Sequence, residues 1–477
     1  MLFSSVEFIV CFLPLVLAGY ALLYRLGLHR ALVAFLTVTS LIFYAWWHPS
    51  DTFWLLGSVV VNFWIGQWLA ARPGKALLAI GVAGNLALLA YFKYTNFFLE
   101  NVSALTGLSL PTLSIILPLA ISFHTFQQIA YLVDIHRGHV HRPNFLHYTL
   151  FVVFFPQLIA GPIVHHTESL PQIEGRDAFP LNWGNIRLGL AWFVIGLQKK
   201  VVLADGIAVY ADAAFSSGTT PSMGLAWVGA LAYTLQLYFD FSGYSDMAIG
   251  LARMFGVVLP DNFNSPYKAK NIIEFWRRWH ITLSRWLRDY LYISLGGNRK
   301  GSVRRHLNLM LTMLLGGLWH GAGWNFVIWG GLHGLYLMVN HAWHGLCRAV
   351  GCDPNRTGLA GRISGQALTL LAVVVAWVFF RATTLDQAMA ILSGMAGLNP
   401  TELTEGVRFE ALLWIALLSI IALFAPNTQE WLRCGPSSPL LRLRPWLAPV
   451  IGIWAVIGLL IVVAKGSSAQ SFIYMVF

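Results

Sequence analysis

The sequence predicts an all-α polytopic membrane protein, and three observations support this fold class. Apolar residues make up 57% of the 477 positions, whereas charged residues make up only 11%. Soluble domains carry about 25% charged residues, so this composition is typical of a chain that lies largely in a membrane. The apolar blocks are continuous instead of alternating, which excludes a transmembrane barrel. Because lipid offers no hydrogen-bond partners, such blocks must cross it as helices.

The apolar blocks are spread evenly along the chain, and neither a long soluble region nor an internal repeat separates them. We therefore expect one membrane domain that covers residues 1–477. A full span needs about 20 residues, so the shorter blocks are expected to be tilted, broken or partly inserted. The expected membrane helices are 8–24, 31–46, 53–70, 76–92, 113–133, 148–164, 186–203, 225–252, 307–319, 324–345, 366–381, 411–425 and 446–464.

The net charge of +11 is interpreted as a topology signal, because Lys and Arg mark the cytoplasmic loops of membrane proteins. On this rule the basic pairs Arg25/Arg30, Arg72/Lys75 and Arg137/Arg142 are cytoplasmic, and Glu168, Glu174 and Asp177 lie on the other side. Residues 268–305 hold ten Lys/Arg against two acids and are expected to be cytoplasmic, yet simple alternation of the spans places them outside. One crossing is therefore missing between 165 and 268, and 201–216 is a candidate for it.

Several other classes of function are excluded. No basic segment carries a nucleic-acid-binding motif, so the positive charge does not indicate nucleic acid as a partner. The four cysteines, Cys11, Cys347, Cys352 and Cys434, form neither a CxxC pair nor a metal-ligand spacing. We therefore expect no disulfide, no thiol nucleophile and no metal site.

The segment 271–290 has the pattern of a basic amphipathic helix that lies in the membrane interface. Apolar and aromatic residues recur every three to four positions, from Ile272 to Tyr290, while four arginines occupy other faces. His280 falls on the apolar face and is expected to be buried. It has either a functional role or a structural one, as an interfacial histidine bonded to backbone or lipid phosphate. A turn or re-entrant loop, 262–268, precedes this helix, and together they form the segment 262–294.

Two carboxylates, Asp240 and Asp246, fall inside an apolar span. Intramembrane acids are candidates for functional residues. The alternative is a helix-packing network, because the neighbouring glycine and serines allow close helix approach.

His320 lies in an almost uncharged, glycine-rich run, GGLWHGAGWN, at 316–325 within the helices 307–345. An ionisable side chain at membrane depth is costly and marks a functional site, and imidazole is the side chain best suited to general base catalysis near neutral pH. Four glycines around it indicate a helix break or a close backbone approach. The alternative is a buried histidine that hydrogen-bonds a neighbouring helix. His333, further along, is interpreted as a packing residue.

Nine motifs together resemble the membrane-bound O-acyltransferase family, and most closely its alginate O-acetyltransferase branch. They are FYAWW (43–47), PLAISFH (118–124), FFPQLIAGP (154–162), GLQKK (196–200), YFDFSGYSD (238–246), FWRRWH (275–280), WLRDY (286–290), LWHGA (318–322) and FIYMVF (472–477). The resemblance implies a ring of about 11–13 transmembrane helices, with re-entrant and interfacial helices, around a central tunnel. It also implies that His320 is the catalytic residue and that His280 is a second functional residue.

The same resemblance implies the reaction and its partners. Cytoplasmic acetyl-CoA is the expected acyl donor substrate, no bound cofactor is expected, and a periplasmic SGNH-type acetyltransferase is the expected partner across a bacterial inner membrane. The product is an O-acetylated exopolysaccharide, alginate or a similar polymer. Residues expected to line the tunnel or contact substrate are Trp319, Asn325, Asp240 and Asp246, and those expected to attract the CoA phosphates are Lys268, Lys270, Arg277 and Arg278.

Three alternatives stay open at this point. A related enzyme of the family could carry another acyl group, as in D-alanyl transfer to teichoic acid. A polysaccharide or lipid transporter would be a different class, although transporters often show repeated halves and this sequence shows none. A purely structural assembly subunit would not need His320.

Overall fold

The computed structural model describes residues 1–139, 144–175, 178–216, 220–351, 353, 358–399, 406–432, 444–465 and 472–473. Within these residues every regular element is a helix, which confirms the all-α prediction. Outside them lie Arg142 and Asp177, used above for orientation, as well as Cys352, Cys434 and residues 474–477.

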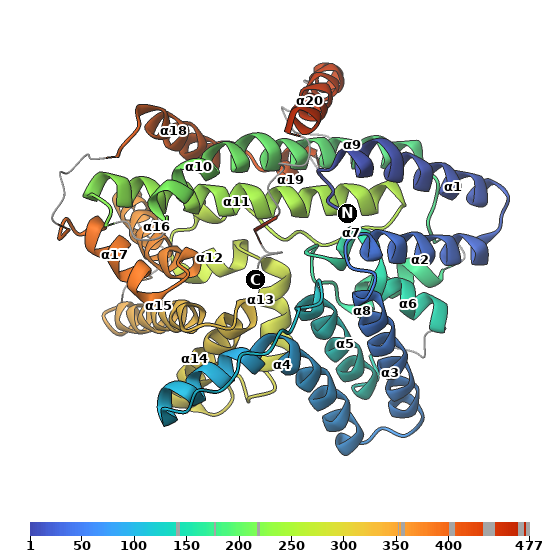
Figure 1. Cartoon of the computed structure of the whole chain (residues 1–477), viewed down its shortest axis with the longest axis horizontal. Coiled ribbons are helices and arrows are strands. Elements are labelled where there is room, and N and C mark those ends of the chain that lie inside the picture. Colours follow the sequence, from blue (N-terminus) through green and yellow to red (C-terminus); the bar gives the residue numbers. More distant parts are fainter. Residues whose placement is uncertain are drawn as a thin grey trace. The chain divides into compact units, whose positions relative to one another are not determined.

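The chain divides into two compact units. The first comprises Met1–Gln198, Gly243–Asp261 and Gly435–Val476. Its helices are η1 (Glu7–Phe12), α1 (Leu13–Arg25), α2 (His29–Ala45), α3 (Asp51–Ala71), α4 (Lys75–Thr106), α5 (Ile121–His136), α6 (Phe145–Val153), α7 (Phe155–Leu158), α8 (His166–Glu174), α9 (Trp183–Gln198) and α20 (Arg444–Lys465). The α-helices are labelled in Figure 1.

The second unit comprises Lys199–Ser242 and Asn262–Cys434. Helix α11 (Met223–Met254) contributes residues 223–242 to this unit and 243–254 to the first. The other helices of the second unit are η2 (Lys199–Ala204), α10 (Asp205–Ala214), η3 (Pro266–Lys268), α12 (Ile272–Arg278), α13 (Ile281–Trp286), η4 (Leu287–Tyr292), α14 (Gly301–His320), α15 (Trp324–Ala349), α16 (Leu359–Arg381), α17 (Leu385–Met395), α18 (Phe409–Phe424) and α19 (Thr428–Leu432).

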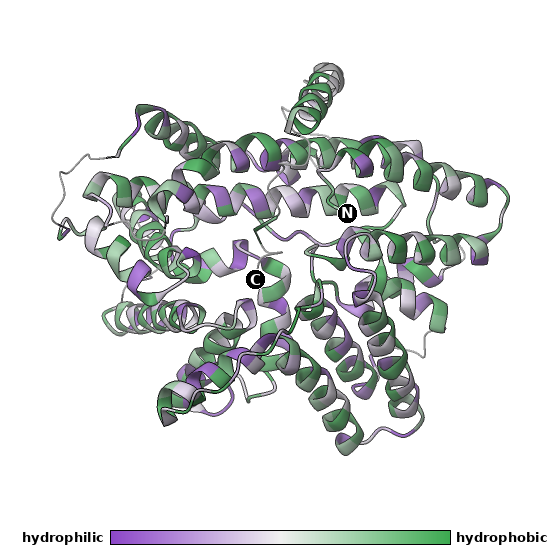
Figure 2. Cartoon of the chain, viewed as in Figure 1, coloured by the Kyte–Doolittle hydropathy of each residue, from purple (hydrophilic) through white to green (hydrophobic). Residues whose placement is uncertain are grey.

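Hydrophobic residues dominate along the helices, and hydrophilic residues occur in shorter stretches between them (Figure 2). Among the described residues, four helices are long and apolar enough to cross a membrane, namely Glu7–Arg25, Asp51–Ala71, Lys75–Thr106 and Leu359–Arg381. Three shorter apolar helices accompany them, His29–Ala45, Phe409–Phe424 and Gly452–Ala464. Each of these seven overlaps an expected membrane helix.

Prolines account for two differences from the expected helices. The expected helix 113–133 begins only at Ile121, because Pro118 and the left-handed Ala120 (φ 59°) precede it. The expected helix 148–164 is interrupted at Phe154 and continues as the short α7, in which Pro156 occupies the first turn. The segment 201–216, a candidate for the missing crossing, follows α9 without a loop, as η2 and α10.

The prediction of one continuous helix over 271–290 is wrong. Helix α12 ends at Arg278, His280 adopts a left-handed conformation (φ 40°), and α13 begins at Ile281. The loop after Asp261 accounts for the break, because it forms backbone hydrogen bonds with both ends of the interruption. Asn264 N–H donates to the Arg278 carbonyl, and Ile281 N–H donates to the Asn262 carbonyl, each over 2.9 Å. These bonds replace the intrahelical bonds that a continuous helix would make.

Candidate active site

His320 is the last residue of α14, and only three residues separate it from α15. Gly321 and Gly323 are both extended, so the glycine-rich run interrupts the helix here, as the sequence predicts. A Cβ atom on Gly321 would clash with the ring of Phe326. The absence of a side chain at position 321 therefore allows Phe326 to fold back against the end of α14.

Two other glycines bring α14 and α15 into backbone contact. A Cβ atom on Gly317 would clash with the Phe326 carbonyl, and one on Gly330 would clash with the Met313 carbonyl. Small residues permit this approach of helix backbones in membrane proteins. The glycines of this hairpin thus serve both purposes that the sequence predicts, a helix break after His320 and close helix packing before it.

The imidazole of His320 is 4% exposed and lies among aromatic rings. Its ring centroid is 4.9 Å from that of Trp319, 5.0 Å from that of Trp329 and 5.3 Å from that of Phe380. The expected role of Trp319, lining the tunnel or contacting substrate, stays a prediction. Rings of this kind keep bulk water away from the imidazole.

His280 is fully buried, as predicted, and its ring is oriented by Asn262. Its Nδ1 atom lies 3.0 Å from Asn262 Oδ1. The same oxygen accepts from Thr282 Oγ1 at 2.9 Å and from the Thr282 backbone N–H at 3.4 Å. A backbone N–H can only donate, so this amide atom is the oxygen, and the neutral imidazole carries its proton on Nδ1. The lone pair is then on Nε2.

A series of aromatic contacts joins the segment of His280 to His320. Trp279, next to His280, lies 4.9 Å from Trp377 of α16, measured between ring centroids. Trp377 stacks on Trp329 of α15 at 5.7 Å, and Trp329 in turn contacts His320. All these rings belong to the second unit. The two histidines are therefore held by one aromatic cluster, although they lie 40 positions apart in the sequence.

Asn325, predicted to contact substrate, has a structural partner. Its buried Nδ2 group donates to the Ala382 carbonyl over 2.7 Å, which ties the first turn of α15 to the end of α16. The second N–H of this amide group and its oxygen Oδ1, which has no hydrogen-bond partner among the described residues, are the atoms left for a substrate.

The four basic residues predicted to attract CoA phosphates fall into two groups. Lys268 donates through Nζ to the Ala425 carbonyl at 2.6 Å, and Arg278 forms an ion pair with Glu274 at 2.8 Å. Lys270 and Arg277 are exposed. Burial acts to raise the pKa of Glu274, but hydrogen bonds from the Lys270 backbone N–H and from Arg278 outweigh it and lower that pKa. Lys268 and Arg278 thus stabilise the fold of this segment.

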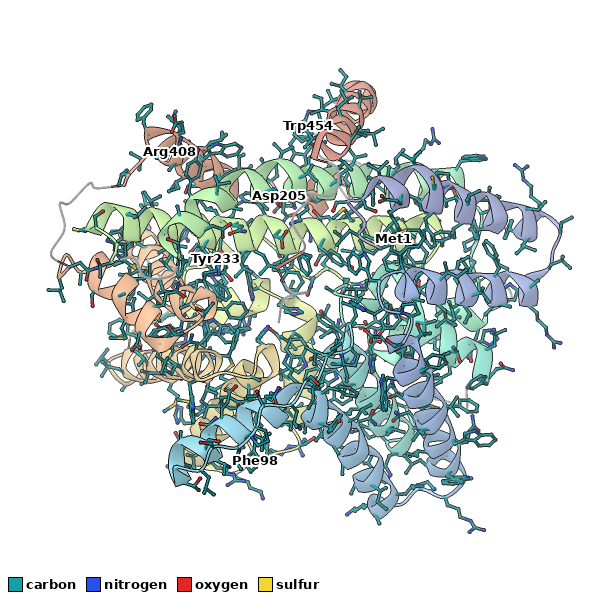
Figure 3. All side chains as sticks on the ribbon, in the orientation of Figure 1. Met1, Phe98, Asp205, Tyr233, Arg408 and Trp454 are labelled. Carbon is teal, nitrogen blue, oxygen red and sulfur yellow. The ribbon has the colours of Figure 1, made fainter. Side chains whose placement is uncertain are left out.

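Asp240 is part of a buried ion cluster in the second unit. Lys200 Nζ lies 2.7 Å from Asp240 Oδ1 and 2.8 Å from Oδ1 of Asp205, which Figure 3 labels at the start of α10. All three side chains are less than a tenth exposed. These contacts favour the helix-packing interpretation for Asp240. Asp246 is also buried, on the part of α11 that belongs to the first unit.

Three residues at the site were not predicted to function there. The sequence places Asn262 only in a loop, favours packing for His333 and gives Trp329 no role. His333 is indeed fully buried, and its ring lies 4.8 Å from that of Trp329. The spacing of Asn325, Trp329 and His333 at every fourth position places them on one face of α15, and this spacing was a usable signal.

Comparison with known proteins identifies the family of this chain. The chain matches the model of the membrane-bound O-acyltransferase family, MBOAT, over residues 136–363, which include both histidines. It is 45% identical over 433 residues to a peptidoglycan O-acetyltransferase of Helicobacter pylori, an alignment that covers 84% of this chain and 81% of that protein. It is 43% identical over 415 residues to a probable alginate O-acetylase, AlgI, of Pseudomonas putida, with 85% and 82% covered.

A third relative is more distant. A teichoic acid D-alanyltransferase of Streptococcus thermophilus is 29% identical over 263 residues, which cover 50% of this chain and 61% of that protein. The helical fold, its apolar spans and these relatives define a multi-pass membrane enzyme of the O-acyltransferase class. The chain belongs to the MBOAT family.

Proposed function

We propose that this enzyme transfers an acetyl group from cytoplasmic acetyl-CoA for the O-acetylation of a polysaccharide outside the bacterial inner membrane. The observation that supports this most directly is His320 itself, a buried imidazole at the end of a broken, glycine-rich hairpin. The O-acetylating relatives match more of the chain, at higher identity, than the D-alanyl relative does. Acetyl is therefore the favoured acyl group.

In the proposed reaction His320 is the general base. It removes the proton from an acceptor hydroxyl, whose oxygen attacks the thioester carbonyl and forms a tetrahedral oxyanion. Collapse of that oxyanion forms the ester and breaks the carbon–sulfur bond, and the imidazolium returns its proton to the departing thiolate. Backbone N–H groups at the helix interruption and the second N–H of Asn325 are the proposed oxyanion donors.

His280 is proposed to orient the acyl donor. With its proton on Nδ1, it presents an Nε2 lone pair that accepts a hydrogen bond but does not donate one. The exposed Lys270 and Arg277 are proposed to attract the CoA phosphates, an interaction that added salt should weaken. Lys268 and Arg278 are proposed to add to this electrostatic attraction, although Lys268 is held by the Ala425 carbonyl and Arg278 by Glu274.

The acceptor is proposed to be a polysaccharide reached through a periplasmic SGNH-type acetyltransferase partner. The named relatives act on different polymers, peptidoglycan in one case and, by its name, alginate in the other, at nearly equal identity to this chain. The shared chemistry is O-acetylation of a sugar hydroxyl. Supplying purified alginate-type and peptidoglycan-type acceptors to the same membranes, and measuring which polymer becomes O-acetylated, would distinguish the two acceptors.

The test in cells is His320→Ala, with the O-acetyl content of the polysaccharide as the measurement. We expect loss of O-acetylation at an unchanged protein level. His344→Ala is the matched control, because His344 lies near the far end of α15 and is partly exposed. Normal O-acetylation in the His320→Ala strain would contradict the mechanism and favour the assembly-subunit alternative. Uptake of intact labelled polysaccharide or lipid without consumption of acetyl-CoA would favour the transporter alternative.

A further inference from the structure

His333 lies at the centre of an aromatic cluster beside the proposed catalytic histidine. Its ring centroid is 4.8 Å from that of Trp329 on the same helix and 5.1 Å from that of Trp276 on α12. The rings of Trp276 and Trp329 are themselves 5.9 Å apart. Trp329 also contacts His320 at 5.0 Å. The cluster therefore adjoins the site where the acyl group reacts.

The side chains of His333, Trp276 and Trp329 carry four polar atoms that are buried without a hydrogen-bond partner among the residues that the structure describes. They are Nδ1 and Nε2 of His333 and the Nε1 atoms of Trp276 and Trp329. Packing alone would be served better by apolar rings, because an unsatisfied buried polar group costs free energy. Several such atoms on neighbouring rings indicate a polar ligand that satisfies them.

The chemistry of the four atoms restricts that ligand. Each indole nitrogen only donates, while a neutral imidazole donates from one nitrogen and accepts at the other. The four atoms therefore offer three donors and one acceptor. The other rings around His333 are aromatic and include those of Phe275, Tyr336 and Trp377. A buried anion would need a cation as its partner here. A neutral secondary amide fits, because its carbonyl accepts from the donors and its N–H donates to the imidazole.

We propose that His333, Trp276 and Trp329 form a binding site for a secondary amide of the acyl donor, such as those in the pantetheine arm of CoA. This inference rests on the proposed function, because it takes the donor to be a CoA thioester. An amide held beside Trp329 would position the thioester near His320. His333 is thus a donor-binding residue of this reaction, distinct from the base.

The experiment compares donors with and without an amide. Inner-membrane vesicles that contain the enzyme and its acceptor are supplied with S-acetyl-N-acetylcysteamine, which carries one amide, with S-butyl thioacetate, which carries none, and with acetyl-CoA. Initial rates of thiol release are corrected with His320→Ala vesicles. We expect His333→Phe to lower kcat/KM for the amide donor about tenfold and to leave the amide-free donor within about twofold.

Two further variants keep the test decisive. Trp276→Phe removes one N–H donor, keeps an aromatic ring and should give the same selective loss. Trp343→Phe removes the indole of an exposed tryptophan on α15 and should change neither rate. Equal losses with both small donors, or no loss, would overturn the proposed amide site and leave the proposed function intact.

If the enzyme does not turn over the small thioesters, the values of kcat and KM for acetyl-CoA test the proposed amide site. A raised KM with kcat unchanged in His333→Phe supports the site, and a lowered kcat with KM unchanged overturns it. Failure of the wild-type enzyme to use acetyl-CoA at all would instead refute the proposed function.

Discussion

Nδ1 of His280 lies 3.0 Å from Oδ1 of Asn262, and this contact determines which nitrogen of the ring carries the proton. The two residues are 18 positions apart and meet because the loop at 262–264 forms backbone hydrogen bonds with the interruption between α12 and α13. The left-handed backbone at His280 turns its side chain inward at that interruption. One loop thus supplies both the break in the helix and the partner of the histidine.

The first prediction concerns Asn262. Asn262→Ala removes the acceptor for His280 Nδ1–H, so the proton can move to Nε2 and the ring can rotate. We expect acyl transfer to fall about tenfold, because the loss of one well-positioned hydrogen bond costs about 1–1.5 kcal/mol. Thr282→Val removes one of the contacts to Asn262 Oδ1 and should cause a smaller loss. Rates in membrane vesicles measure both, and full activity in Asn262→Ala would refute the orienting role.

The second prediction concerns the α14–α15 contact. Gly330→Ala places a methyl group against the Met313 carbonyl and should destabilise the protein by about 1–3 kcal/mol, the usual cost of overpacking. Its neighbour provides the control, because a Cβ atom on Gly331 would lie 3.5 Å from Leu314 Cδ2, an ordinary contact. Gly331→Ala should be neutral or stabilising by up to about 1 kcal/mol. Thermal unfolding in detergent compares the two variants, and equal melting temperatures would contradict the packing described.

The third prediction concerns the buried ion cluster. Lys200→Met leaves the carboxylates of Asp205 and Asp240 close together without their cation, and removing one partner of a buried pair costs about 3–5 kcal/mol. The matched control is Asp212→Asn, which breaks the half-exposed pair with Arg381 and should cost about 0–1 kcal/mol. If Lys200→Met unfolds no more readily than Asp212→Asn, the cluster does not stabilise this unit.

The sequence predicts the helix break at His320 but not the one at His280, because only the first depends on residues next to the histidine in the chain. The break after His320 follows from glycines that stand next to it in the chain, and Gly321 and Gly323 are indeed extended. The interruption at His280 depends instead on backbone hydrogen bonds from Asn262 and Asn264, which a periodic pattern does not reveal. The amphipathic period of 271–290 is real, yet tertiary contacts override it.

Pairings between distant positions could not be predicted for the same reason. Lys200 and Asp240 form an ion pair only in the folded chain, so the sequence alone leaves both interpretations of Asp240 open, substrate contact and helix packing. Asn325 stood beside His320 in the sequence and was therefore expected at the reaction centre, although its amide group bonds α16. His333 was correctly expected to be buried, but the unsatisfied atoms around it become evident only in three dimensions.

The most direct test of the account is the transfer of radiolabelled acetyl from acetyl-CoA to polysaccharide in inner-membrane vesicles, comparing the wild-type enzyme with His320→Ala. We expect transfer to fall by about 100-fold or more, because general base catalysis contributes effects of this size. Equal amounts of folded protein, checked by size-exclusion chromatography, exclude a loss of stability as the cause. Transfer by His320→Ala at a rate close to that of the wild type would show that another group is the base.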